Sequence, residues 1–192
     1  MAQRGFGTQT FGSTPVPVFG TTLGAAVNPT PDFYTGQLGA GSNPSSARIN
    51  LSGAYQFRGG DHVVIGASNS FTQGTTTPPD GGTIQEVLSA SDYVVTGLNR
   101  KHAAGEYVIL ALPCSQIQIQ TPAANTGSAY LAEDNTAGVN SPTLIAEIPK
   151  SSLLPSYTLP QGAGGNINAV ETQKLWLDGT SGDKFTPSLL TI

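Results

Sequence analysis

The chain has few of the side chains on which catalysis and metal binding depend. Only 10% of its 192 residues are charged, and it contains two His, one Trp and one Cys. Most catalytic sites gather titratable groups, metal ligands or a phosphate cradle in one place. The single Cys114 has no partner for an internal disulfide and follows Pro113 at the end of an apolar run, so we expect a buried structural thiol. This composition predicts a protein that is not an enzyme and needs no cofactor or metal.

Basic clusters and long apolar runs are also scarce. The net charge is -4, and the only adjacent basic pair is Arg100-Lys101. Nucleic-acid affinity depends on neutralising phosphates, so we expect no nucleic-acid partner. No apolar run approaches the ~20 residues of a membrane span, and the first nine residues lack the apolar core of a secretory signal. We therefore expect a protein that is made in a cytoplasm, stays soluble and does not bind membranes.

What the chain has in quantity is short apolar runs separated by turn residues. Its 24 Gly and 14 Pro, together with β-branched residues, interrupt every window of helical length, which predicts an all-β fold. Residues 47–57 alternate apolar and polar side chains, as a half-buried strand does. Residues 69–82 are expected to form a long loop. The other expected strands are 62–67, 83–90, 93–98, 106–112, 115–120, 128–132, 144–148, 169–177 and 189–192.

These segments predict one or two β-sandwich or β-barrel units preceded by an extended N-terminal arm. Residues 47–120 are expected to form a β-barrel-like domain. Residues 121–192 form a second β-region, which is either a separate unit or part of the same sandwich. A boundary near 113–122 favours two units, and a single larger sandwich is the alternative.

Residues 1–46 are rich in Gly, Pro and Thr but too apolar for a solvated linker. We expect an extended arm that becomes ordered when its apolar side chains dock on its own domain or on a neighbouring subunit. A tail that is disordered in isolation is the alternative. The side chains of the arm that are expected to make these contacts are Phe6, Phe11, Val18, Phe19, Phe33 and Tyr34.

Some residues could also serve catalysis, metal binding or sugar stacking, but the sequence supports these roles less well. His62 and His102 are the only imidazoles, with no Gly-x-Ser-x-Gly elbow and no zinc-ligand spacing. Asp178 and Asp183 are close enough in sequence for a glycosidase pair or a calcium loop, but Asp-Gly-Thr-Ser-Gly-Asp more simply predicts a hairpin turn. Trp176 is expected in the core, with sugar stacking as the alternative.

Residues 60–108 contain four short sequence motifs. They read Gly60-Asp-His-Val-Val-Ile65, Gly82-Thr-Ile-Gln-Glu-Val87, Ser91-Asp-Tyr-Val-Val-Thr-Gly-Leu98 and His102-Ala-Ala-Gly-Glu-Tyr-Val108. This pattern resembles the small β-barrel module of tailed-bacteriophage virion proteins. The stretch 175–190 resembles the ends of phage head-decoration proteins. The insertion Thr77-Pro-Pro-Asp-Gly81 departs from the compact module.

The resemblance implies a viral structural protein, most like a head decoration (cement) protein. Such a protein sits on the outer surface of the capsid, contacts the major capsid protein and copies of itself as a homotrimer, and stabilises the shell against internal pressure. The alternatives are a tail or head-tail connector component, or a glycan-binding module of a tail fibre or spike. The last alternative requires exposed aromatic side chains near the long loop, around Phe71 or Tyr93.

Overall fold

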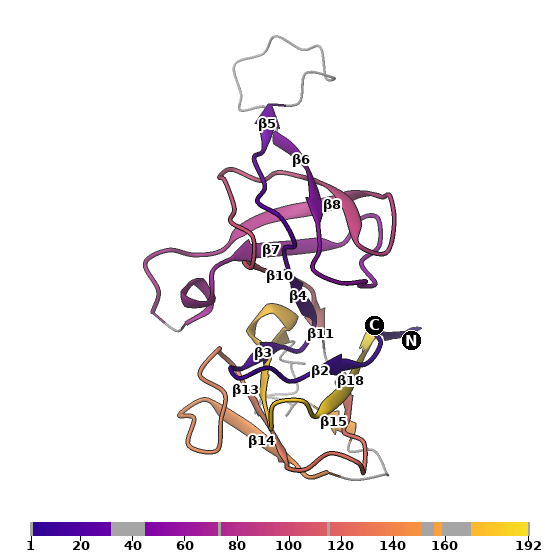
Figure 1. Cartoon of the computed structure of the whole chain (residues 1–192), viewed down its shortest axis with the longest axis vertical. Helices are drawn as coiled ribbons and strands as arrows, with labels where there is room; N and C mark the ends of the chain where they lie inside the picture. The colour runs from indigo at the N-terminus through magenta and orange to yellow at the C-terminus, as the bar shows by residue number, and fades with distance from the viewer. Residues whose placement is uncertain are drawn as a thin grey trace, which may run out of the picture. The chain divides into compact units, whose positions relative to one another are not determined.

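The computed structural model describes residues 2–31, 45–72, 74–114, 116–150, 156–158 and 170–191. Over these residues the protein is all-β with curled sheets, which confirms the predicted fold class (Figure 1). The helical turns in the described part are two short 3-10 segments, η2 (Ser68–Phe71) and η3 (Thr172–Lys174). No helix in these ranges is long and apolar enough to cross a membrane.

The chain divides into two compact units. Unit 1 comprises Met1–Gly20, Phe71–Gly74 and Leu112–Ile192, and unit 2 comprises Thr21–Ser70 and Thr75–Ala111. Each unit is therefore built from separated stretches of sequence. The expected arm boundary at residue 46 does not coincide with this division, because residues 2–20 fold into unit 1 and residues 21–31 into unit 2.

Unit 2 contains one antiparallel sheet with the strand order β4-β10-β7-β8-β9-β6-β5 (Figure 1). Alternating side chains of the sheet face the core, among them the fully buried Ile65, Ile84, Tyr93, Val95 and Val108. The strands are β4 (Gly20–Thr22), β5 (Thr30–Pro31), β6 (Ser45–Asn50), β7 (His62–Gly66), β8 (Asp80–Val87), β9 (Asp92–Thr96) and β10 (Tyr107–Leu110).

In its described residues, unit 1 contains three antiparallel sheets. One has the order β1-β18-β12-β15, with β2 also paired to β18; another has the order β14-β13-β17-β3; and the third pairs β11 with β16. Their bounds are β1 (Ala2–Gly5), β2 (Gln9–Thr10), β3 (Val16–Pro17), β11 (Pro113–Cys114), β12 (Gln116–Gln120), β13 (Ala129–Ala132), β14 (Leu144–Ile148), β15 (Ser156–Thr158), β16 (Val170–Glu171), β17 (Trp176–Asp178) and β18 (Lys184–Thr191).

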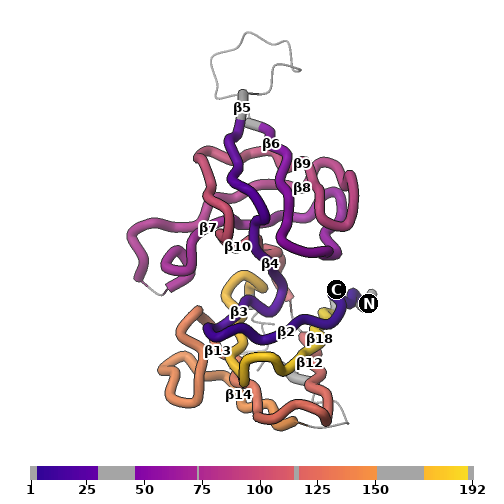
Figure 2. The backbone as a smooth tube through the Cα atoms, in the orientation of Figure 1, coloured from indigo at the N-terminus to yellow at the C-terminus, as the bar shows by residue number. Residues whose placement is uncertain are grey.

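The two ends of the described chain lie side by side in unit 1 (Figure 2). Ala2 pairs with Thr191 and Gly5 with Ser188 across the antiparallel pair β1–β18. The N-terminal segment continues as β2 against β18 and β3 against β17. Residues 2–20 therefore supply strands to the sheets that the C-terminal half of the chain forms.

Several strand bounds differ from those predicted. Residues 47–57 have the expected alternation, and Ile49, Leu51, Tyr55 and Phe57 are all buried. The regular strand nevertheless ends at Asn50, because the chain bends after Leu51 and leaves the ladder. The predicted loop 69–82 is shorter than expected, since β8 begins at Asp80, and β18 begins at Lys184 rather than residue 189. Two-residue strands such as β2 and β3 carry no period that a sequence pattern can reveal.

Candidate functional site

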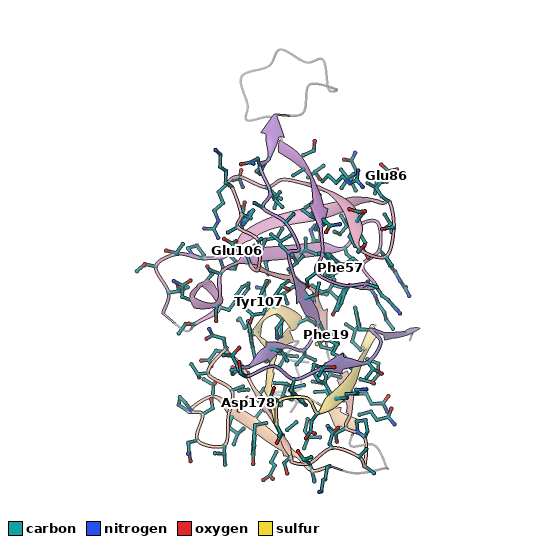
Figure 3. The ribbon with its side chains drawn as sticks, viewed as in Figure 1. Phe19, Phe57, Glu86, Glu106, Tyr107 and Asp178 are labelled. Atoms are coloured by element: carbon teal, nitrogen blue, oxygen red, sulfur yellow. The ribbon has the colours of Figure 1, made fainter. Side chains whose placement is uncertain are left out.

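The structure places four of the six expected arm contacts in the core of unit 1. Phe6 and Phe11 are 3% exposed, and Val18 is fully buried. Phe19, labelled in Figure 3, is also fully buried. The Phe6 and Phe19 rings meet edge to face at 5.2 Å between centroids. Because these side chains contact their own unit, a partner reaches them only if the segment leaves that unit.

The other two expected contacts, Phe33 and Tyr34, lie outside the described residues. The sequence identifies the apolar residues of the arm but not what they touch. The missing signal was the pairing of β1 and β2 with β18, which joins residues about 180 positions apart in the chain and leaves no local pattern.

The aromatic side chains near the long loop differ in their exposure. Tyr93 is fully buried, and its hydroxyl donates to the backbone oxygens of Tyr55 at 2.6 Å and Ala90 at 3.0 Å. Phe71 packs against Trp176 with the ring centroids 5.5 Å apart. Trp176 itself is fully buried, as the sequence predicted. Tyr93 and Trp176 thus belong to the core, whereas Phe71 is half-buried beside Trp176.

The most concentrated polar chemistry of unit 2 surrounds His102, which is 3% exposed. Its Nε2 lies 3.2 Å from Asp80 Oδ2, and its Nδ1 lies 2.8 Å from Glu106 Oε2. Asp80 Oδ2 also accepts the backbone N–H groups of Asn99 at 2.7 Å and Arg100 at 3.1 Å. Burial raises the pKa of Asp80, but the backbone donors and His102 outweigh it and hold that pKa below its ordinary value.

This cluster is better suited to holding chain segments together through hydrogen bonds than to catalysis. Both ring nitrogens of His102 are engaged by carboxylates, so neither is open to a substrate or a metal ion. General acid–base catalysis needs a nitrogen within hydrogen-bond reach of the reacting group. Within the described ranges, moreover, no group of three or more His, Cys, Asp or Glu is arranged to hold a metal ion.

The Asp178–Asp183 stretch of unit 1 is likewise a structural turn. The Asp183 carboxylate accepts the backbone N–H groups of Thr126 at 2.8 Å and Gly127 at 3.0 Å, together with the Thr126 hydroxyl. Burial opposes its ionisation, but these donors prevail and lower the pKa of Asp183. Asp183 thus holds the loop that contains Thr126 and Gly127, whereas Asp178 lies at the end of β17. The arrangement favours the hairpin interpretation over a glycosidase pair.

One face of the unit 2 sheet carries a shallow hollow of about 250 Å³. Gly81, Gly82 and Gly97 form part of its lining, and His62 and Thr83 contribute polar atoms. Pockets for drug-sized ligands usually enclose roughly 300–1,000 Å³, so this hollow is smaller than such a pocket. At the far end of β8, Val87 and Leu88 are exposed at 45% and 44%.

Comparisons with protein-family models, with curated proteins and with solved structures found no match to this chain.

Proposed function

We propose that this protein is a structural component of a tailed-bacteriophage virion, and specifically a decoration protein on the outer surface of the capsid. Its partners are the major capsid protein and copies of itself, as a homotrimer. It stabilises the shell by adding contacts across the seams between capsid subunits. The proposal starts from the resemblance of residues 60–108 to a virion β-barrel module.

The observation that carries the proposal is the structural use of the residues in that motif. Gly60 and Gly105 have φ angles of +89° and +85°, a region that favours glycine in tight turns. Asp61 Oδ2 accepts the Arg58 backbone N–H at 2.7 Å, which closes the turn before β7. His102 lies between the carboxylates of Asp80, at the start of β8, and Glu106, in the turn before β10. Asp61 and His102 thus hold turns, as polar residues of a scaffold module do.

The surface chemistry is also compatible with a shell component. Charged residues are depleted in the centres of protein interfaces, and this chain has only 10% charged residues. An assembly protein gains affinity from many copies binding in register, so modest individual contacts suffice. Small apolar features such as the 250 Å³ hollow and the exposed Val87–Leu88 pair fit contacts of this kind.

The test is to mix the purified protein with heads that lack it and to measure bound copies and the rupture temperature. Saturable binding at hundreds of copies, with a higher rupture temperature, supports the decoration role. Binding to tails or connectors instead supports a role as a tail or head-tail connector component. Binding to host cells or sugars supports a glycan-binding module of a tail fibre or spike. Absence of binding to any virion part overturns the proposal.

Two surface variants map the contact face without disturbing the core. Gly81→Val fills the hollow, since a Cβ at Gly81 meets no atom within 4 Å, and Gly53→Val adds the same side chain at another open glycine. If the hollow receives a capsid side chain, Gly81→Val lowers head binding and Gly53→Val does not. Leu88→Asp tests the exposed tip of the β8–β9 hairpin in the same assay.

A further inference from the structure

Residues 2–20 lie at the edges of the sheets of unit 1. β1 and β3 are the outermost strands of two different sheets, and β2 runs beside β18 (Figure 2). The backbone of the segment pairs with β17 and β18. Without the segment, the orders β18-β12-β15 and β14-β13-β17 keep their own pairing. The segment is therefore a set of edge strands that two existing sheets accept.

The chain passes through unit 2 between this segment and the strands with which it pairs. Unit 2 comprises Thr21–Ser70 and Thr75–Ala111, whereas β17 and β18 lie in the later stretch Leu112–Ile192. A whole folded unit thus separates the segment from its partners in the sequence. Local connectivity therefore does not determine whether the segment pairs with β17 and β18 of its own chain or of another copy.

The contacts of the segment are strong enough to join two chains. Phe6, Phe11, Val18 and Phe19 are all buried. The ring of Phe11 packs against that of Phe185, with the centroids 4.8 Å apart. Full burial of one side chain of this kind contributes about 1.5–3 kcal/mol. A second copy presents the same acceptor strands, so each of these contacts can form equally well between chains.

The hinge that such an exchange requires is short. Val18 N donates to Leu175 O in unit 1 at 2.9 Å. Two residues later, Gly20 begins β4, which pairs with β10 in the sheet of unit 2. Exchange of an element between copies retains the contacts of the closed chain and changes the backbone at the hinge, which makes it a low-cost route to oligomers.

We propose that copies of this protein exchange the segment, so that residues 2–20 of one copy fill the core of unit 1 in the next. The inference rests on the self-association that the proposed function includes, and it names the contact through which the copies join. Each copy gives one segment and accepts one. Passing the segment from each copy to the next closes a ring, as a homotrimer requires.

Protein concentration decides between the closed and the exchanged arrangement. A tethered segment meets its own acceptor at an effective concentration in the mM range, so a dilute chain closes on itself. Chains that fold together at high concentration meet the acceptors of other copies as well. Opening a folded copy withdraws four buried side chains, so either arrangement persists once it has formed.

The test uses one engineered cysteine on each side of the contact. Thr10 of β2 and Lys184 of β18 are exposed and face each other. Phe11 N donates to Asp183 O beside them, so they form a non-hydrogen-bonded pair. The Cα atoms of such a pair are about 4.5 Å apart, within reach of a disulfide. The native Cys114 is 1% exposed and does not compete.

The Thr10→Cys and Lys184→Cys chains are produced together in one cell, purified and oxidised without unfolding. We expect a disulfide-linked heterodimer on a denaturing gel, because each chain carries one half of the pair. Ser13→Cys with Lys184→Cys is the matched control, since Ser13 is exposed on the same segment but lies beyond β2. Random collisions give equal yields of linked chains in the two mixtures, and equal yields overturn the proposal.

The double variant Thr10→Cys/Lys184→Cys measures the dependence on concentration. Refolded from urea at about 1 µM, far below the effective concentration of a tethered segment, it should form the disulfide within one chain. The same protein purified from cells without unfolding should form it between chains. Links within one chain in both preparations overturn the proposal. These measurements need no capsid, so a failure to bind heads overturns the proposed function and leaves the exchange standing.

Discussion

The ring of Phe11 lies directly against the backbone of Gly179. A Cβ built on Gly179 would stand 2.9 Å from Cε2 of the ring and 3.0 Å from Cδ2 and Cζ. Backbone hydrogen bonds hold the strand in this position, because Phe11 N donates to Asp183 O at 2.9 Å and Gly182 N donates to Phe11 O at 3.0 Å. Phe11, which the sequence predicted as a contact residue of the arm, thus packs against the Asp178–Asp183 turn.

We predict that Gly179→Ala destabilises unit 1 by about 1–3 kcal/mol, the usual cost of overpacking a filled core. Trp176 is the only tryptophan and is fully buried in unit 1, so its fluorescence reports urea unfolding of this unit. Gly5→Ala is the control, since a Cβ there meets no atom within 4 Å and the entropy effect of Gly→Ala is shared. Equal midpoints for the two variants would contradict the contact.

The N-terminal segment should be required for unit 1 to fold. We expect Phe19→Ala to cost about 3–5 kcal/mol, because it removes a fully buried ring. Ser13→Ala, at an exposed position of the same segment, should change little. Deleting residues 1–20 should expose Trp176 and shift its emission to longer wavelength.

That outcome differs from the one expected of an arm that docks on a neighbouring subunit, whose loss would leave the β-fold intact. The deletion removes β1–β3 and four core side chains together. Native-like Trp176 fluorescence in the truncated protein would restore the arm interpretation.

Acid should weaken unit 1 through Asp183. Its pKa is lowered in the folded state, chiefly because the Thr126 and Gly127 donors overcome the effect of burial. The stability it contributes is therefore present above the unfolded value of about 3.9 and is lost as the pH falls through the folded value. Asp183→Asn should lower stability at neutral pH and flatten its decline below about pH 4. Glu133→Gln, an exposed residue of unit 1, should leave the acid limb unchanged.

Cys114 should resist thiol reagents in the native protein. It is 1% exposed, and burial raises the pKa of its thiol to about 11. Since the thiolate is the reactive form, labelling at about pH 8 should be slow and should accelerate when urea unfolds unit 1. The rate is measured with a chromogenic disulfide reagent. Native labelling as fast as that of a small thiol would contradict the buried placement.

Some of the fold follows from local sequence alone. The Gly and Pro content excludes long helices, and apolar runs such as residues 62–67 and 106–112 match β7 and β10 within two residues. Residues 144–148 coincide with β14. The buried state of Cys114 and Trp176 was also predicted, because both lie within apolar sequence. These features depend on a residue and its near neighbours, which is the information a sequence pattern contains.

Only the tertiary structure decided where the N-terminal segment goes and how the polar residues are used. The sequence identified Phe6, Phe11, Val18 and Phe19 as side chains that need burial, but their partners are strands at the other end of the chain. Likewise, nothing in the spacing of Asp80 and His102 shows that a carboxylate and an imidazole meet at 3.2 Å. Composition and alternation determined that this chain forms sheets, whereas long-range pairing, which leaves no periodic trace, decided which segments share a core.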